Sequence, residues 1–483
     1  MAIEFSRRQF FGGLSALLAT SAARSYADAT GVGKPDLAFG VLSDIHISPL
    51  PYMERFLGGD RTSHRVRETD LLEKAFRYFD EQGADGVLIA GDLADWGLVG
   101  QLQAVADCWF KVFPNGRSAR DGRKVEQLFA LGNHDFEGFN YGYAKKACGE
   151  TKIPASEKLV TDMAGNWQRI FGEPYRPIWQ KEVKGYTFIG GHWCKWNGVT
   201  GIEDYMKEHG PALRGARPFF YVQHPQPKDT CLGSWIWGHD DGCSTRALSP
   251  YPNAVAFSGH SHKPLTNELN VWQGAFTSIG TATLCQLGTG VGRENSTHEV
   301  KNHRSVMAYH RGRAGDVTEA AHGQFVRVYG GFMEIERREF VRGESVGPNW
   351  VVPLPAGREA PFLYANRAAA SKAPGPFPDG AKVTVTRGDG KVRLEFPPAR
   401  VVAGASPIAD YEIEALHDEM DVTRTLFTRY VYGPGVFFDP AKEKGPIVAE
   451  FDETLFPKGG RCRFRVRAHE IFGKFNAPIC GYA

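Results

Sequence analysis

Five short motifs, far apart in the chain, contain side chains of the kinds that bind metal ions. Together they offer two carboxylates, one amide and four imidazoles, which come from Asp44, His46, Asp92, Asn133, His224, His260 and His262. Oxygen and imidazole ligands without thiolate suit divalent metals such as manganese, iron or zinc. Because one catalytic zinc ion takes about three ligands from a protein, a set of this size indicates two ions that share a bridging carboxylate. Two such ions, about 3.5–4 Å apart, can hold a hydroxide against a phosphoryl group, so in-line displacement at phosphorus is the reaction the set serves best.

Taken singly, each motif has a simpler explanation. Gly91-Asp92 is typical of a turn with a cap, and a lone His46 is more often a core or surface histidine than a ligand. His260-x-His262 is about as often a pair of metal ligands as a pair of ordinary histidines, and alternate residues of a strand do point the same way. Gly132-Asn133-His134-Asp135 is the most specific, since four specified residues recur by chance well under about 1% of the time in such a chain. All five in order leave the simpler explanations little room.

Each motif directly follows an apolar run of strand length. The runs cover residues 37–42, 86–90, 125–131, 218–223 and 254–258. Helical spacing appears between them, once from Leu72 to Phe79 before Gly83 and once from Leu98 to Val112. Strands that alternate with helices predict an α/β sheet, and ligands of such sheets gather beyond the carboxyl ends of the strands. We therefore expect the motifs to converge.

The series of motifs resembles the calcineurin-like metallophosphoesterases over residues 36–355, which include two short alternating strands between Val326 and Phe340. The resemblance implies an α/β fold, a four-layer α-β-β-α sandwich with two central sheets and helices outside. It also implies two groups of metal ligands. The first ion would be held by Asp44, His46 and His262, and the second by Asn133, His224 and His260. Asp92 would bridge the two ions. At the fourth motif, where the family often has His-x-Pro or His-His-Pro, Gln223-His224-Pro225 leaves His224 as the assigned ligand and Gln223 as the alternative.

The resemblance also implies an acid catalyst. His134 would contact the phosphate and protonate the leaving group, a role that suits a group whose pKa lies near working pH. Asp135 would orient that imidazole. The purple acid phosphatase branch has a tyrosine three residues after the bridging aspartate, where this chain has Asp95. We therefore expect no ferric–tyrosinate site and no purple colour.

These features predict an exported binuclear-metal phosphoesterase, a hydrolase acting on phosphate esters with two divalent ions (manganese, iron or zinc). Two alternatives stay open: the same site acting on a phosphodiester rather than a monoester, and a non-catalytic protein that binds carbohydrate or the cell envelope. Long insertions at 47–66, 140–181, 195–217, 227–253 and 287–323 read as loops, which at this length are usually functional or disordered. Candidate substrate contacts in or beside them are His64, His192, Trp193, His239, Asp240, Asp241, His298 and Arg304.

The first 29 residues have the layout of an export signal. Arg7 and Arg8 form the twin arginine that directs folded proteins to the twin-arginine export machinery, and Ala27-Asp28-Ala29 is an A-x-A cleavage pattern. The uncharged run from Phe10 to Ala23 is too short to cross a hydrocarbon core of about 30 Å, although an uncut anchor stays an alternative. We expect a soluble mature protein from Thr30 onward, without a stable transmembrane segment, in the periplasm or outside the cell.

Composition sets limits on the class of protein. The chain has 483 residues, 42% hydrophobic and 23% charged, with 57 Lys+Arg against 55 Asp+Glu, which gives a net charge of +2. This composition is that of a globular protein and excludes a disordered chain; near-neutrality argues against bulk nucleic-acid binding. Its eight cysteines include no C-x-x-C pair, which excludes a zinc ribbon. Cys231 with Cys243, and Cys462 with Cys480, are the nearest pairs, and the pairing stays open.

The C-terminal part has another pattern. Residues 356–380 form a linker, rich in small residues and proline at 366–380. From 381 to 483 short alternating runs predict a small all-β sandwich, with strands at 391–396, 411–416, 423–432, 447–451 and 462–468. The runs at 392–398 and 463–468 resemble a fibronectin type III domain. The alternating arginines of the second run indicate a solvated strand face, with an anionic ligand patch as the alternative.

Overall fold

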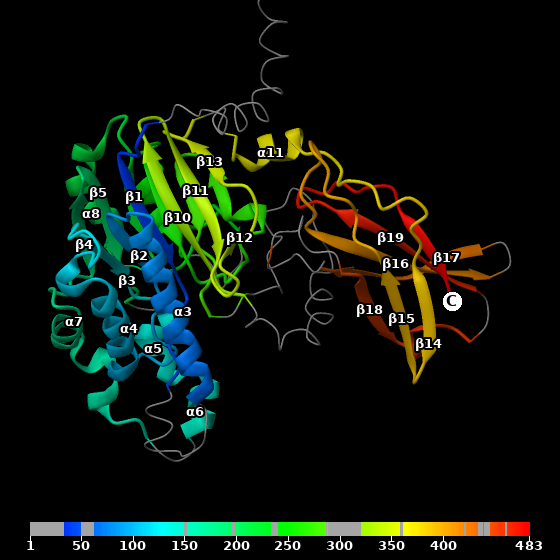
Figure 1. The fold of residues 1–483 in the computed structure, drawn as a ribbon, viewed down its shortest axis with the longest axis horizontal. Helices are drawn as coiled ribbons and strands as arrows, with labels where there is room; N and C mark the ends of the chain where they lie inside the picture. Colours follow the sequence, from blue (N-terminus) through cyan, green and yellow to red (C-terminus); the bar gives the residue numbers. More distant parts are fainter. Residues whose placement is uncertain are drawn as a thin grey trace, which may run out of the picture.

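The computed structural model describes residues 33–49, 62–148, 152–194, 199, 201–232, 240–285, 287, 320–357, 361–419, 422–432, 438, 445–458 and 461–483. It shows an α/β body followed by an all-β body (Figure 1). The expected signal at 1–29 and the candidate contacts His239, His298 and Arg304 lie outside these residues, as does the side chain of His64.

The first sheet of the α/β body carries the first three motifs. Its strand order is β12 (Glu344–Ser345), β11 (Phe332–Glu339), β10 (His322–Tyr329), β1 (Leu37–Leu42), β2 (Gly86–Ala90) and β3 (Glu126–Ala130), with β13 (Trp350–Pro353) paired to β11. Strands β1, β2 and β3 are parallel, so their carboxyl ends meet at one edge. Every residue of β1 and β2 is buried, as expected of parallel strands covered on both faces, which read as continuous apolar runs.

The second sheet carries the other two motifs. Its order is β4 (Ile178–Val183), β5 (Tyr186–Gly191), β6 (Phe219–Val222), β7 (Ala254–Ser258), β9 (Thr277–Gly280) and β8 (Val271–Gln273). Strands β5, β6, β7 and β9 run parallel. The carboxyl ends of β6 and β7, which precede His224 and His260, therefore also lie at one edge.

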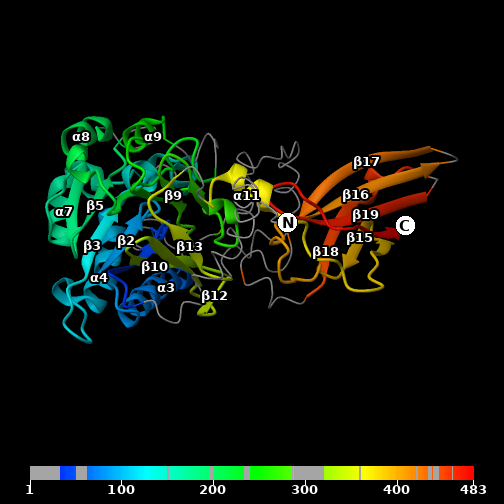
Figure 2. The ribbon, with the colours of Figure 1, turned by 90° about the horizontal axis from the view of Figure 1, so that it is seen from above.

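The two sheets pack face to face between layers of helices, which confirms the expected four-layer sandwich. In the core between the sheets, the Phe39 ring meets Phe188, Phe220 and Phe257 edge-on, with centroids 5.2–5.7 Å apart. The outer face of the first sheet is covered by α3 (Thr62–Glu81), α4 (Val99–Val112) and α7 (Met163–Phe171). The outer face of the second is covered by α8 (Ile202–His209) and α9 (Cys243–Leu248) (Figure 2).

Three of the insertions that read as loops contain regular elements, which corrects that expectation. Residues 140–181 hold α6 (Gly142–Cys148), α7 and most of β4, and they follow α5 (Asn133–Glu137). Residues 195–217 and 227–253 hold α8 and α9. These helices are short, with eight residues in α8 and six in α9, so their periodicity is too brief to stand out in the sequence.

The C-terminal body has two antiparallel sheets that share one core. They run in the orders β14 (Thr384–Gly388), β15 (Lys391–Phe396), β18 (Ile447–Asp452) and β17 (Val422–Val431), β16 (Asp410–Glu419), β19 (Arg461–His469), β20 (Ile479–Tyr482). All five expected strands are present. The arginines of β19 pair with acids of β16, Arg465 Nε with Glu414 at 2.6 Å and Arg467 Nε with Glu412 at 2.7 Å, so this face is charge-balanced and favours the solvated-face interpretation.

Helix α11 (Tyr364–Ala370) lies in the expected linker, between the two bodies in both views (Figures 1 and 2). Its Arg367 Nη2 is 2.5 Å from Glu268 Oε2 of the α/β body. The Tyr364 ring lies 6.1 Å from that of Phe472 in the C-terminal body. The linker is thus bound on both sides. No helix of the described ranges is long and apolar enough to cross a membrane, and all eight cysteines, which lie in those ranges, are free thiols.

Candidate metal centre

The five motifs converge at the strand ends, as expected. Five of the seven expected ligands have a left-handed backbone, with φ between 49° and 66°: Asp44, His46, Asp92, His260 and His262. Such φ values are uncommon outside glycine and gather where function maintains the strain. The chain therefore turns sharply after β1, β2 and β7 and directs a polar side chain across the edge of the sheet.

The first group of donors lies around Asp44. Its Oδ1 is 2.9 Å from His262 Nε2 and 3.8 Å from His46 Nε2. The two imidazole Nε2 atoms are 3.2 Å apart. This is the group that the resemblance assigned to the first ion.

The second group lies around His224. Its Nε2 is 3.0 Å from Asp92 Oδ2 and 3.0 Å from His260 Nδ1. On the other side of the ring, Nδ1 is 2.8 Å from the Ala90 carbonyl oxygen. Because that carbonyl can only accept, Nδ1 carries a proton, which leaves Nε2 as the ring atom that can bind an ion. Asp92 Oδ2 is also 3.7 Å from His46 Nε2, so this carboxylate links the two groups as a bridging ligand must.

Two buried oxygen atoms test whether this donor set fits metal ions. Asp92 Oδ2 and Asn133 Oδ1 are both buried, and within the described part of the chain neither has a hydrogen-bond partner. Unsatisfied buried polar atoms are rare in native proteins and call for an explanation such as an ion. Both are hard oxygen donors, and both belong to the expected ligand set. The residues therefore fit two divalent cations.

The carboxylates of the centre are held in their ionised form. Burial alone would raise the pKa of Asp92, but the nearby imidazoles of His224 and His134 hold that pKa well below its usual range. Burial would also raise the pKa of Asp44, but the imidazoles of His262 and His224 outweigh burial and lower this pKa. Both groups are thus anionic ligands at neutral pH.

Three motif glycines make this approach possible. Built on the backbone, a Cβ at Gly91 would meet the His224 ring, one at Gly132 the Asp92 carboxylate, and one at Gly259 the Asp44 carboxylate. Each glycine thus supports a metal-binding side chain from another motif. This is a packing reason for glycine at each strand end, and at Gly91 the φ of 89° adds a second.

His134 lies beside the metal ligands. Its side chain is 18% exposed, whereas those of Asp44 and Asp92 are fully buried. Its Nδ1 is 2.9 Å from the Asp95 carbonyl oxygen and 3.2 Å from Asp95 Oδ1. The same Oδ1 is 3.4 Å from His46 Nδ1, so one carboxylate contacts both imidazoles.

Asp135 has a different role from the one expected. Its carboxylate accepts backbone N–H groups from Leu93, Ala94 and Gly132, at 3.1, 2.7 and 2.9 Å. It therefore ties the loop after β2 to the Asn133 motif. The position against the His134 imidazole belongs to Asp95, which the sequence had marked only as the place of the missing tyrosine.

The other candidate contacts divide clearly. Trp193 lies beside the centre, its ring centroid 6.0 Å from that of His260. His192 is buried, and its Nδ1 accepts the Leu131 N–H at 3.0 Å. Asp240 is buried and accepts the Gln223 amide at 3.1 Å, which turns Gln223 away from the ligands and leaves His224 as the ligand of that motif. Asp241 is exposed and accepts the backbone N–H of Cys243.

A comparison with known families decides the assignment. Residues 37–264 match the model of the calcineurin-like phosphoesterases. The chain carries a calcineurin-like phosphoesterase domain. The expectation of a metal-dependent phosphoesterase is confirmed at this level, and every expected metal ligand lies within the matched range.

Solved structures resemble this phosphoesterase domain only distantly. A dimetal phosphatase from Danio rerio is 11% identical, with a TM-score of 0.34 over 66% of this chain and 99% of that one. A purple acid phosphatase from yellow lupin (Lupinus luteus) seeds is 14% identical, with a TM-score of 0.37 over 66% and 54%. A predicted phosphoesterase from Streptococcus pneumoniae is 10% identical, with a TM-score of 0.28 over 67% and 99%. No curated protein matches the chain.

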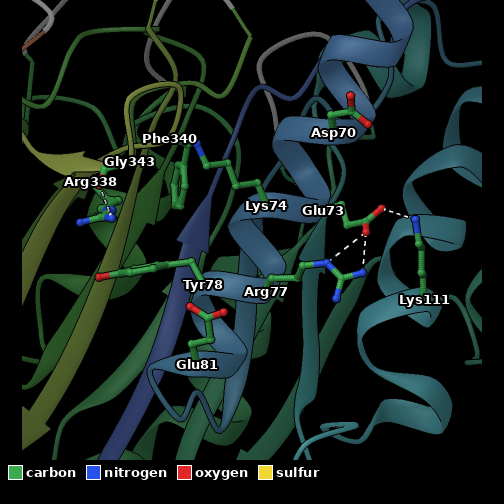
Figure 3. A pocket seen from close by; sticks show the side chains of 10 residues that line it. All are labelled: Asp70, Glu73, Lys74, Arg77, Tyr78, Glu81, Lys111, Arg338, Phe340 and Gly343. Carbon is green, nitrogen blue, oxygen red and sulfur yellow. Dashed lines mark hydrogen bonds and ion pairs between the residues drawn. The ribbon is translucent and has the colours of Figure 1, made fainter.

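A hollow of about 540 Å³ on the surface of the phosphoesterase domain lies between α3, α4 and the end of β11 (Figure 3). Three of its charged side chains pair with one another: Glu73 accepts from Arg77 at 2.6 Å and from Lys111 at 2.7 Å. Lys74 and Arg338 donate to carbonyl oxygens of the turn after β11. None of the expected metal ligands lines it, so the candidate site is the centre at the strand ends.

Proposed function

We propose that this phosphoesterase is a binuclear-metal hydrolase that transfers the phosphoryl group of a phosphate ester to water. One observation carries the proposal: two groups of buried donors are joined through Asp92, whose Oδ2 lies 3.0 Å from His224 Nε2 and 3.7 Å from His46 Nε2. A single ion would not need both groups. A shared carboxylate between them is the arrangement that two ions require.

The ligand assignment follows from these contacts. Asp44, His46 and His262 would hold the first ion, and Asn133, His224 and His260 the second, with Asp92 shared. When bound, two divalent ions lower the pKa of water and neutralise charge on the phosphoryl oxygens. Imidazole and oxygen donors suit manganese, iron or zinc.

His134 is the acid of the proposed mechanism. Its Nδ1 faces Asp95, so proton transfer to the leaving oxygen falls to Nε2. Asp95 contacts His134 Nδ1 through its backbone carbonyl and its carboxylate, and so holds the ring in place. Burial raises the pKa of Asp95, yet contacts with His134 and His46 outweigh this and lower it well below its usual value, which supports an ionised partner.

The ester type is tested by comparing p-nitrophenyl phosphate with bis-p-nitrophenyl phosphate. Protein freed of metal is loaded with manganese, iron or zinc, and Asp92→Ala is the control. We expect metal-dependent turnover of the monoester that Asp92→Ala lacks. A clear preference for the diester would favour the phosphodiesterase alternative. Fewer than one ion per chain after loading, with no turnover of either compound, would favour the non-catalytic binding protein and overturn the proposal.

Export through the twin-arginine machinery to the periplasm or beyond belongs to the same proposal. It is supported by Arg7, Arg8 and the Ala27-Asp28-Ala29 pattern. Replacing Arg7 and Arg8 with lysine should retain the protein, uncut, in the cytoplasm of an expressing bacterium. Processing that continues unchanged would contradict this route.

The likeness of the C-terminal body to a fibronectin type III domain also stays a proposal. It is supported by the antiparallel orders β14-β15-β18 and β17-β16-β19-β20 around one core, since an aligned pair of such sheets is the architecture of these sandwiches. Its charge-balanced face at β19 offers no anion site among the described contacts.

A further inference from the structure

An asparagine that binds a metal ion must be held in one of two orientations. Its amide oxygen and nitrogen occupy nearly equivalent positions, but only the oxygen can coordinate a cation, because the nitrogen carries two hydrogens and no available lone pair. Asn133 is 6% exposed, so water cannot fix its orientation. Other side chains must do so.

Tyr141 contacts the nitrogen end of this amide. Asn133 Nδ2 donates a hydrogen bond to the Tyr141 hydroxyl oxygen, 2.7 Å away. Asn133 Oδ1 is buried and, in the described residues, accepts no hydrogen bond. The nitrogen is thus occupied by Tyr141, and the oxygen is the end available to an ion.

Glu137 fixes the direction of this hydrogen bond. A tyrosine hydroxyl can donate or accept, so on its own it would tolerate either amide orientation. The Tyr141 hydroxyl, however, also bonds the Glu137 carboxylate. An ionised carboxylate only accepts. The hydroxyl therefore donates its one proton to Glu137 and must accept the hydrogen bond from Asn133. The chain of hydrogen bonds therefore runs from Asn133 to Tyr141 to Glu137.

The local fold brings these residues together. Asn133 begins α5 and Glu137 ends it, and a 3₁₀ turn at Gly138–Asn140 then leads to Tyr141. A Cβ at Gly138 would meet the Asp95 carbonyl oxygen and lie 2.9 Å from Trp96 Cα, so glycine lets this turn pack on the loop after β2. The Tyr141 ring then meets the His134 imidazole edge-on, with centroids 4.9 Å apart.

We propose that Tyr141 and Glu137 are positioning residues that hold the Asn133 amide with its oxygen toward the second metal ion, and so set the affinity of that site. This inference rests on the proposed binuclear function and adds to it a determinant outside the ligand set. Groups that orient metal ligands typically change metal affinity by about 10–100-fold.

The test is Tyr141→Phe, which keeps the ring against His134 and removes only the hydroxyl. Metal-free protein is titrated with manganese or zinc by calorimetry, and the bound metal is counted by elemental analysis after dialysis. We expect wild-type protein to bind two ions per chain, and Tyr141→Phe to bind the second about 10–100-fold more weakly with the first unchanged. Tyr205→Phe is the matched control, since the Tyr205 hydroxyl also bonds a side-chain amide, that of Gln180 at 2.7 Å, but far from the centre in α8.

A second background separates orientation from general disturbance. In Asn133→Asp either carboxylate oxygen can face the ion, so adding Tyr141→Phe should then cost little, and the two changes should be strongly non-additive. Equal loss from Tyr141→Phe in both backgrounds, or equal affinity for both ions in Tyr141→Phe itself, would overturn the inference. Wild-type protein that binds fewer than two ions would instead count against the proposed function.

Discussion

Asp95 Oδ1 lies 3.2 Å from His134 Nδ1 and 3.4 Å from His46 Nδ1, so one carboxylate holds the proposed acid and a metal ligand at once. The two rings it contacts meet edge-on with centroids 4.5 Å apart. One side chain therefore contacts both the proposed acid and a ligand of the first metal site.

Replacing this carboxylate should impair protonation of the leaving group. In His134→Ala we expect kcat to fall about 10²–10⁴-fold, the usual contribution of a general acid. In Asp95→Asn we expect a smaller fall in kcat. Both losses should be larger for phenyl phosphate than for p-nitrophenyl phosphate, whose leaving group needs little protonation. Steady-state kinetics with both esters measure this, with metal content determined for each variant. Losses independent of the leaving group would contradict the role given to His134.

Loss of the bridge should abolish activity. Asp92→Ala removes the ligand shared by both donor groups, so we expect hydrolysis to fall below detection and metal content to drop below two ions per chain. The exposed Asp241→Ala serves as the control, because Asp241 lies outside the ligand set and its carboxylate accepts the backbone N–H of Cys243. Full activity of Asp92→Ala would refute the binuclear mechanism.

The strand-end glycines should tolerate no side chain. At Gly259 a methyl group would press on the Ser43 hydroxyl and the Asp44 carboxylate, and Gly259→Ala should therefore weaken the first metal site. Gly100→Ala is a suitable control, since a Cβ there meets nothing within 4 Å and alanine favours its helix by about 1 kcal/mol. Metal titration of both variants tests this prediction. An unchanged metal affinity of Gly259→Ala would show that the loop can move to accommodate the methyl group.

Removing metal should destabilise the phosphoesterase domain. Two buried carboxylates and several imidazoles face each other there, and an ion that binds only the folded state stabilises it by about 2.7 kcal/mol at 100 times its Kd. We expect a chelator to abolish activity and lower the melting temperature, and added metal to restore both. A melting temperature indifferent to chelation would mean that the centre binds metal weakly.

Stability should also depend on His192. Burial lowers its pKa from 6.5 to about 3, so the unfolded chain binds a proton between these values that the folded protein does not. The stabilisation is thus complete above about pH 6.5 and is lost as pH falls toward 3, by about 2 kcal/mol at pH 5. His192→Asn keeps an acceptor for Leu131 N–H and should flatten the pH dependence of unfolding by urea. His209→Asn, at an exposed position, should leave it unchanged.

The sequence predicted the strands that carry the motifs because parallel, doubly buried strands read as apolar runs. Gly86–Ala90 and Ala254–Ser258 are β2 and β7 to the residue. Strand β4 was missed because it lies at a sheet edge and buries only Trp179 and Val183, so it does not read as an apolar run. Helices α8 and α9 were missed because they are only eight and six residues long, too short for a helical period to stand out.

Within the site, sequence and structure diverge where a role depends on tertiary folding. The expected ligands were visible because each belongs to a short motif. Tyr141 carries no motif, and its place beside Asn133 arises from the turn after α5. Asp135 belongs to the Asn133 motif, and Asp95 follows the Asp92 motif. Only the path of the loop after β2 decides which of these two acids faces the His134 imidazole.

The contacts of α11 with the α/β body indicate where the chain can be truncated. Arg367 reaches Glu268, which lies in the loop that follows His262, and Glu268 also takes Arg337 Nη1 at 3.0 Å. A fragment ending at residue 355 would remove Arg367, one of the two cations that contact Glu268, and would expose this partly buried carboxylate to water. We therefore expect a stable catalytic fragment to extend to Ala370 and so to include α11, which is a structural part of the phosphoesterase domain as well as a connection to the C-terminal body.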